Sequence, residues 1–365
     1  MISTIILYTS IVQAATITDG PGKMQGDFAY LFDMKVFSDQ LYEMTRNNAE
    51  VLVGSRKQTI RTNTLLLEYG VLDILSISIE KPVSMFQSHE FSNPYAMVYD
   101  PYFMTGTLQH QEILREGDSF FGELAKNGDT PTLTQIGSSS QRSWIGVNFF
   151  PFHERFYTSR GDIFSWKLGL HYRRTNQNNF YSLNENERGA GSGSAAWRIT
   201  GAFSKGTSKS KPYLGFQVIL PSEYTHNFNT ITAFESTIHP AKDSHFKTGV
   251  ELYPLQDTAY GHYACVDLFG KFGYQSWQEI PTGVYLPSVL TTAQDIIISQ
   301  SDNLYAHVGA GVNLQYYTYG AFRIFGHAGF STPQKIENYY NVSSNGTFGW
   351  ALGTEFRFRY RTSVN

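Results

Sequence analysis

Three features of this chain could carry chemistry: a serine followed by Asn-Gly, ten scattered histidines and one glycine-rich stretch. Residues 344–346 supply the Ser-Asn-Gly part of a hydrolytic motif, H-x-S-N-G, in which a histidine stands two positions before the serine. Val342 occupies that position here. A serine hydroxyl without a base nearby keeps its proton and is a poor nucleophile. Since Asn-Gly is also a common turn dipeptide, we interpret residues 343–346 as a loop turn.

The histidines show no H-E-x-x-H motif and no close pair at metal-ligand spacing, so they predict no metal site. The glycine-rich residues 189–196 precede a strand-like pattern instead of a helix, which argues against a phosphate-binding loop. The single cysteine, Cys265, excludes an internal disulfide and a cysteine-based metal cluster. We therefore expect no cofactor, no metal and no catalytic residue.

Large apolar residues alternate strictly with polar ones in many segments, which identifies the elements that would position any functional side chain. Near the C-terminus, Phe356, Phe358 and Tyr360 alternate with Glu355, Arg357, Arg359 and Arg361. A strand sends successive side chains to opposite faces, whereas a helix would scatter them around its circumference. The pattern recurs in about a dozen segments, among them residues 27–37, 165–173, 196–203, 211–221, 245–252, 304–317 and 321–330.

The composition favours a membrane-embedded strand protein over an ordinary soluble domain. Aromatic residues make up 15% of the 365 residues and charged residues only 16%, whereas soluble domains average about 25% charged residues. The mean hydropathy is −0.29, and the chain has no run of about 18 apolar residues that would make a membrane helix. A formal net charge of −3 gives no indication of nucleic-acid binding.

We predict an all-β fold, a transmembrane antiparallel up-and-down β-barrel in the bacterial outer membrane. At about ten residues per membrane strand plus connections, the chain suits about 12–14 strands, and the even counts typical of such barrels favour twelve or fourteen. A soluble β-sandwich would also explain the alternation, but its exposed face would carry more charge than the Gly, His and Gln found here. In the barrel, Phe356 and Tyr360 face lipid, while Arg357 and Arg359 face a wet interior.

The chain divides into a short leader and one barrel domain. Residues 1–15 are interpreted as a signal peptide, because an apolar run at residues 5–12 leads to a small-residue cleavage pattern at Ala14 and Ala15. No Lys or Arg precedes this run, and a structured N-terminus is the alternative. Residues 16–365 then form a single domain, with polar loops expected at residues 176–195 and 275–303.

One long segment, residues 84–128, lacks the alternation and is expected to be an irregular insertion with a short helix. A long insertion between strands is usually functional, so this one would cap the mouth of the barrel or fold into the lumen as a plug. Its apolar residues would then supply a hydrophobic pocket: Met85, Phe86, Phe103, Phe120 and Phe121.

The polar faces of the predicted strands define the candidate site. We expect the lumen to be lined by Lys167, His171, Arg198, Glu251, Asp267, Lys271, His307, Arg323, His327, Glu355, Arg357 and Arg359. One interpretation is a structural network in which opposite charges compensate one another across the barrel wall. The other is a selectivity surface for a polar or anionic solute. The sequence leaves both interpretations open.

Residues 62–84 carry a specific order of features. A strand ending in Tyr-Gly turns through Leu72 and Asp73 and returns as a strand closed by Lys-Pro, and Gly-Asp at 161–162 leads directly into another strand. Together these resemble outer-membrane transporters of the MetA-pathway of phenol degradation type, which are distantly like fatty-acid and aromatic-hydrocarbon channels. The family's basic residue after Tyr-Gly is absent here, and the chain continues past Tyr360 instead of ending on an aromatic residue. The resemblance implies uptake of small hydrophobic molecules and assigns no binding residue.

The expected function is passive uptake or diffusion of small solutes across the outer membrane, without enzymatic activity. The expected partners are outer-membrane lipid, a small-molecule solute, and either other envelope proteins or a second copy of the chain, but no nucleic acid. One alternative is a barrel that conducts nothing and serves as a structural or complex-forming component. Another is a barrel enzyme that acts on lipids.

Overall fold

The computed structural model of the protein describes residues 18–44, 50–92, 133–139, 143–153, 163–175, 194–207, 209–228, 234–257, 262–286, 294–316, 320–337 and 342–361. Most of these residues belong to strands: β1 Gln25–Met44, β2 Glu50–Leu72, β3 Leu75–Ser92, β4 Leu133–Ser139, β5 Trp144–Phe149, β6 Ile163–Arg173, β7 Ala196–Gly206, β8 Ser210–Pro221, β9 Tyr224–Phe228, β10 Phe234–Ile238, β11 Asp243–Asp257, β12 His262–Gln275, β13 Gln278–Leu286, β14 Gln294–Gln300, β15 Asn303–Tyr316, β16 Gly320–Ser331, β17 Gln334–Glu337 and β18 Val342–Arg361. Within these ranges, no helix is long and apolar enough to cross a membrane.

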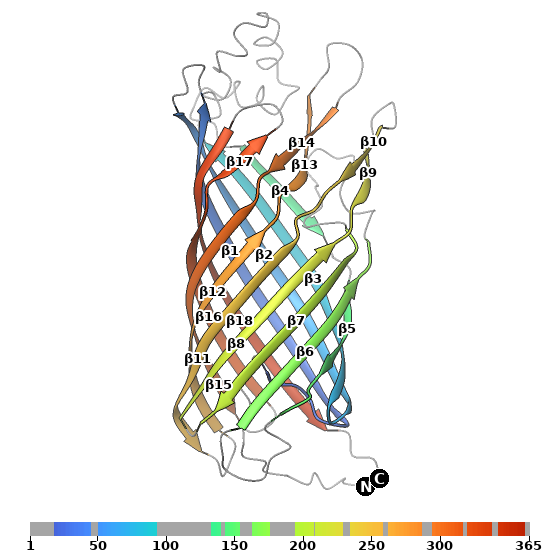
Figure 1. Cartoon of the computed structure of the whole chain (residues 1–365), viewed down its shortest axis with the longest axis vertical. Helices are drawn as coiled ribbons and strands as arrows, with labels where there is room; N and C mark the ends of the chain where they lie inside the picture. The colour runs from blue at the N-terminus through green and yellow to red at the C-terminus, as the bar shows by residue number, and fades with distance from the viewer. Residues whose placement is uncertain are drawn as a thin grey trace, which may run out of the picture.

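Twelve of the strands close into one antiparallel barrel (Figure 1). Their order around the wall is β1-β2-β3-β5-β6-β7-β8-β11-β12-β15-β16-β18, and β18 pairs back onto β1. Closure removes the free sheet edges, so the strand N–H and C=O groups pair within the wall, as a chain surrounded by lipid requires. The prediction of an all-β barrel is confirmed, with twelve as the strand count.

The two ends of the barrel differ in the length of their connections. At one end, which we call the short-turn end, Asp73 and Ile74 alone join β2 to β3, and residues 317–319 join β15 to β16. At the other end, the long connections include the hairpins β9–β10 and β13–β14, which stand at the top of Figure 1. Bacterial outer-membrane barrels typically have short periplasmic turns and longer extracellular loops. The short-turn end therefore corresponds to the periplasmic side.

The outer face of the wall is apolar. On β6, the side chains of Leu168 and Leu170 are 40% and 45% exposed, whereas His171 on the inward face is 7% exposed. Aromatic side chains gather near both ends of this apolar belt: Tyr69, Phe149, Phe164 and Tyr360 at the short-turn end, and Tyr172, Trp197, Tyr274 and Phe330 at the other. An apolar belt between two aromatic girdles is the outer surface of a barrel that spans a membrane.

The first strands are longer than the membrane requires. β1 has 20 residues and β2 has 23, whereas about 9–11 tilted residues cross the hydrocarbon layer. β3 continues to Ser92 and pairs with β2 along residues 84–92, so the prediction of an irregular insertion is wrong for these residues, and the rest of that segment, residues 93–128, lies outside the described residues. The loop expected at residues 275–303 likewise contains β13 and β14. Pairing satisfies backbone N–H and C=O groups beyond the membrane as well as within it, and this favours the longer strands.

Candidate functional site in the barrel lumen

Two arginines of β18 anchor the polar network at the short-turn end of the lumen. Arg359 donates from Nε and Nη2 to the two carboxylate oxygens of Asp27, at 2.6 and 2.7 Å. Arg357 donates from Nε and Nη2 to Oε1 of Glu355, at 3.1 and 2.8 Å. Two N–H donors on one carboxylate are among the stronger charge-assisted hydrogen bonds, and they fix the guanidinium planes. Since Asp27 lies on β1, Arg359 also ties together the two strands that close the barrel.

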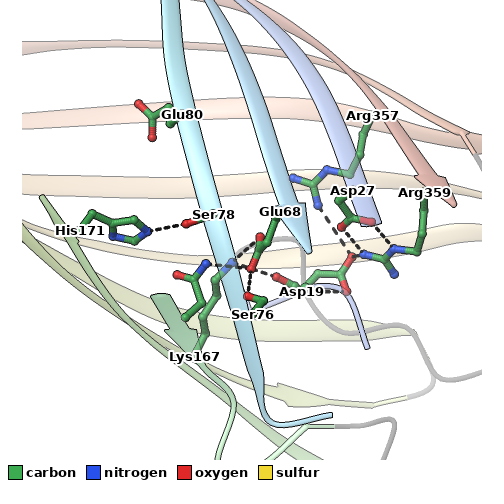
Figure 2. A network of polar contacts seen from close by, with 12 residues as sticks. Asp19, Asp27, Glu68, Ser76, Ser78, Glu80, Lys167, His171, Arg357 and Arg359 are labelled. Carbon is green, nitrogen blue, oxygen red and sulfur yellow. Dashed lines mark hydrogen bonds and ion pairs between the residues drawn. The ribbon is translucent and has the colours of Figure 1, made fainter. Parts of the chain in front are cut away.

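The N-terminal segment, residues 18–23, lies against these arginines, with residues 18–22 inside the barrel and Lys23 exposed at its end (Figure 2). Nη2 of Arg359 donates to Oδ2 of Asp19 at 2.9 Å, and Nη1 of Arg357 lies 3.8 Å from the same oxygen. Lys167 donates from Nζ to the backbone carbonyl oxygen of Asp19 at 3.1 Å. Burial alone would raise the pKa of the Asp19 carboxyl group, but the charges of Arg359 and Arg357 outweigh it and hold this pKa well below its usual range. Asp19 is therefore a charged carboxylate in the lumen at neutral pH.

Glu68 of β2 is the centre of a second group of polar contacts (Figure 2). Its carboxylate accepts hydrogen bonds from Nδ2 of Asn148 at 2.8 Å and from the hydroxyl group of Ser76. Nζ of Lys167 lies 3.5 Å from the other carboxylate oxygen. β3 and β5 separate β2 from β6 in the wall, so Lys167 reaches across part of the lumen to make this ion pair.

A third group lies further from the short-turn end, around Trp144 of β5. The guanidinium carbon atoms of Arg198 and Arg173 lie 4.6 and 4.7 Å from the Trp144 ring centroid, within the range of a cation–π interaction. Arg198 also donates to Oε2 of Glu80 at 2.7 Å. Arg198 was expected to line the lumen, whereas its partners Glu80 and Trp144 were not identified from the sequence.

Asp267 of β12 organises another part of the wall. Its carboxylate accepts from Nη2 of Arg323 at 2.7 Å and from the hydroxyl group of Tyr213 at 2.7 Å, and Nζ of Lys247 lies 3.6 Å away. These partners lie on β16, β8 and β11, so one carboxylate links four strands. Glu251 on β11 accepts from the hydroxyl group of Tyr253 at 2.6 Å.

Inward-facing cations also pack against inward-facing aromatic rings. Nζ of Lys247 lies 4.0 Å from the ring centroid of Phe269. Lys271 lies 5.2 Å from the Tyr305 ring in the same way, and Arg323 lies 5.2 Å from the Phe325 ring. These pairs combine Coulombic attraction with burial of apolar surface. The lumen lining in the described residues is therefore amphiphilic.

His307 and His327 form a close pair on β15 and β16. Their Nδ1 atoms are 3.1 Å apart, so one ring donates its Nδ1–H and the other accepts. Among the residues that the structure describes, no three His, Cys, Asp or Glu side chains are grouped to hold a metal ion. The geometry supports a hydrogen-bonded pair in the lumen lining.

His171 forms a pair with Ser78 that sequence reasoning missed. Nε2 of His171 lies 3.0 Å from Oγ of Ser78, a distance at which a histidine could act as a base on a serine. However, both side chains are buried, and Nδ1 of His171 has no hydrogen-bond partner in the described structure. A triad needs a third group that orients the ring, and it needs free N–H donors to stabilise an oxyanion. The neighbouring β3 backbone is instead engaged in strand pairing.

Most charged residues in the described lumen thus lie beside opposite charges, in pairs that often bridge strands that are not neighbours. This geometry favours the structural-network interpretation over a selectivity surface of one sign. Of the residues expected to form a hydrophobic pocket, Met85 and Phe86 are on β3 with side chains outside the described residues, and Phe103, Phe120 and Phe121 lie outside them entirely. Residues 1–15 are outside the described residues as well.

A closed twelve-stranded antiparallel wall with an apolar outer belt, a polar interior and short turns at one end defines a bacterial outer-membrane β-barrel protein. No protein-family model matches the chain, and no curated protein matches it. Among solved structures, an outer membrane channel from Pseudomonas putida F1 is similar at 10% sequence identity, with a TM-score of 0.47 over 96% of this chain and 100% of the other.

Two further solved structures are similar to this chain at comparable sequence identity. A FadL homologue from Pseudomonas aeruginosa has 9% identity and a TM-score of 0.35, covering 92% of this chain and 90% of its own. The outer membrane protease OmpT from Escherichia coli has 8% identity and a TM-score of 0.34, covering 97% of this chain and 100% of its own.

Proposed function

We propose that this protein is an outer-membrane channel through which small solutes diffuse passively. The observation that carries the proposal is the amphiphilic, charge-compensated lining of a closed twelve-stranded wall. Barrels of about eight strands have interiors just wide enough for their own side chains, whereas those of 16–18 strands leave an aqueous channel. Twelve strands lie between these limits, which suits a narrow path for small molecules.

The lining also indicates which class of solute the channel would admit. Cations paired with carboxylates attract neither anions nor cations strongly, so we infer weak selectivity for the sign of charge. Half-buried rings next to cations, such as Phe269 and Phe325, offer stacking surfaces for solutes with an apolar or aromatic part. This agrees with the small hydrophobic solutes that the sequence resemblance implies, and it assigns no role in catalysis.

Conductance and permeation measurements test this proposal. The purified, detergent-folded protein should give stepwise currents in a planar bilayer, with a reversal potential near zero in a potassium chloride gradient. In proteoliposomes, the ratio of the entry rate of phenyl glucoside to that of glucose should be measured for the unaltered protein and for a Phe269→Ala variant. The ratio should be higher for the unaltered protein. A folded protein that gives no current, even after the N-terminal segment is deleted, would support a structural or complex-forming role instead.

A further inference from the structure

We propose that the N-terminal segment is a plug that closes the short-turn end of the lumen and has to be displaced before a solute can pass. The proposal rests on the proposed function, because a plug matters only in a lumen that conducts. Neither the segment nor its contacts were identified from the sequence, which placed the plug in residues 84–128.

The segment crosses the lumen from one wall to the opposite wall. The hydroxyl oxygen of Thr18 lies 2.9 Å from that of Ser204 on β7, and the next residue, Asp19, accepts from Arg359 on β18 at 2.9 Å. In the closed wall, β7 and β18 are six strands apart in either direction. Two consecutive residues thus contact strands on opposite sides of the wall, through side chains of Ser204 and Arg359 that reach into the lumen.

The segment also fits closely against the rest of the wall. Thr18 and Pro21 are fully buried. A Cβ atom added to Gly20 would overlap the ring of Phe150, and a Cβ atom added to Gly70 of β2 would overlap the carbonyl group of Gly22. These two positions need glycine because the backbone of the segment and its surroundings approach one another so closely. At these two positions the segment is in direct contact with Phe150 and with β2.

The attachments of the segment are weaker than those of a barrel strand. A strand in the wall is paired on both sides, whereas the segment makes one isolated parallel bridge between Lys23 and Gly70. Its other described anchors include the ion pairs of Asp19, the hydrogen bond that Lys167 donates to the Asp19 carbonyl oxygen, and the hydrogen bond between Thr18 and Ser204. Such contacts can break while the twelve paired strands stay intact, so the segment can leave the lumen without unfolding the barrel.

A reversible disulfide gives the decisive experiment. Thr18 and Ser204 would be replaced by cysteine in a Cys265→Ser background, since the contact between their hydroxyl groups brings the two positions close together. Oxidation should lock the segment in place and abolish or strongly reduce the current, and reduction should restore it. Each single-cysteine variant serves as the control for the oxidant.

Two variants release the segment without a disulfide. Asp19→Asn removes the charge that Arg359 and Arg357 hold, and Gly70→Ala displaces Gly22 from the wall. Both variants should raise the open probability of the channel by about tenfold, because each weakens the contacts that hold the segment in the lumen. Gly270→Ala is the matched control, because a Cβ atom there meets its nearest neighbour at an ordinary 3.6 Å. It should conduct like the unaltered protein.

The outcomes separate the plug from the channel. One outcome is that the oxidised and reduced double-cysteine proteins conduct equally and both release variants show the same open probability as Gly270→Ala. In that case the segment is not a plug, but the proposed channel function is unaffected. If no variant conducts, including one that lacks residues 18–22, the proposed function and the plug both fail. Redox-dependent current together with higher currents in both release variants supports the plug.

Discussion

Arg359 and Asp19 are 340 residues apart in the sequence, yet Nη2 of Arg359 lies 2.9 Å from Oδ2 of Asp19. The same guanidinium group donates to both oxygens of Asp27 on β1. One side chain on the last strand therefore holds the first strand and the N-terminal segment at once. Changes at Arg359 should affect the stability of the wall as well as closure of the lumen.

Replacing Arg359 with Gln should destabilise the folded barrel by on the order of 3 kcal/mol, because Asp27 would remain buried without its counter-charge. Arg359→Lys should recover only part of this loss, since an ammonium group cannot form the two parallel hydrogen bonds. Urea unfolding in detergent, followed by the electrophoretic shift of the folded barrel, measures both effects. The control is Arg174→Gln at an exposed site, where a change within about 0.5 kcal/mol is expected. Equal stability of the Gln and Lys variants would contradict the role of the paired donors.

The contribution of Asp19 to holding the N-terminal segment in the lumen should be independent of pH over the physiological range. Its folded-state pKa is depressed, so its stabilising contribution is complete above the unfolded pKa of about 3.9 and is lost only as the pH falls through the lower folded value. The difference in open probability between the unaltered protein and Asp19→Asn should therefore stay constant from pH 8 to about pH 5. If this difference in open probability disappears with a midpoint near neutral pH, another titrating group holds the segment in the lumen.

The orientation of β12 can be tested at Leu268, an outward-facing residue that is 45% exposed. Leu268→Arg places a charge on the lipid face and should cost about 2–4 kcal/mol, the value expected near the middle of the bilayer. Refolding into lipid vesicles at a series of urea concentrations measures the loss. Ser222→Arg, at an exposed position just after β8, should change the stability by less than about 0.5 kcal/mol. If the two variants are equally stable, the outer face of β12 is not in contact with lipid.

The Ser78–His171 pair should be catalytically silent. Because Ser78 is buried and Nδ1 of His171 has no partner in the described structure, an activated-serine reagent such as a fluorophosphonate should not label the folded protein. Esterase activity toward short-chain and lipid esters should be no greater than that of Ser78→Ala. Labelling that is lost in Ser78→Ala would favour the enzyme alternative over the channel.

The sequence alone predicts the class of fold and the side of the wall that most residues face. A period of two is a local property of each strand, so Leu168 and Leu170 could be placed outward and Lys167 and His171 inward before any partner was known. Most of the inward residues predicted as lumen lining fall into polar clusters in the structure, such as Arg198 with Glu80 and Asp267 with Arg323.

The partners of these residues could not be predicted in the same way. The distance of Lys167 from Glu68 depends on how many strands separate them and on the register of each pair, which the alternation does not encode. Asp19 lies in a Gly- and Pro-rich stretch typical of a turn, so nothing local distinguishes it from a surface residue. The lengths of β1 and β2 were also underestimated, because the prediction assumed strands only as long as the membrane is thick.

The pairing of β1 with β18 has a consequence for biogenesis. Gln25 lies opposite Arg361, so the seam can form only when nearly the whole chain has been delivered to the membrane. Loop closure over such a separation is entropically costly and makes folding slow. Until the seam forms, both terminal strands expose unpaired edges, which are prone to aggregation. We therefore expect C-terminal truncation within β18 to block insertion of all twelve strands together.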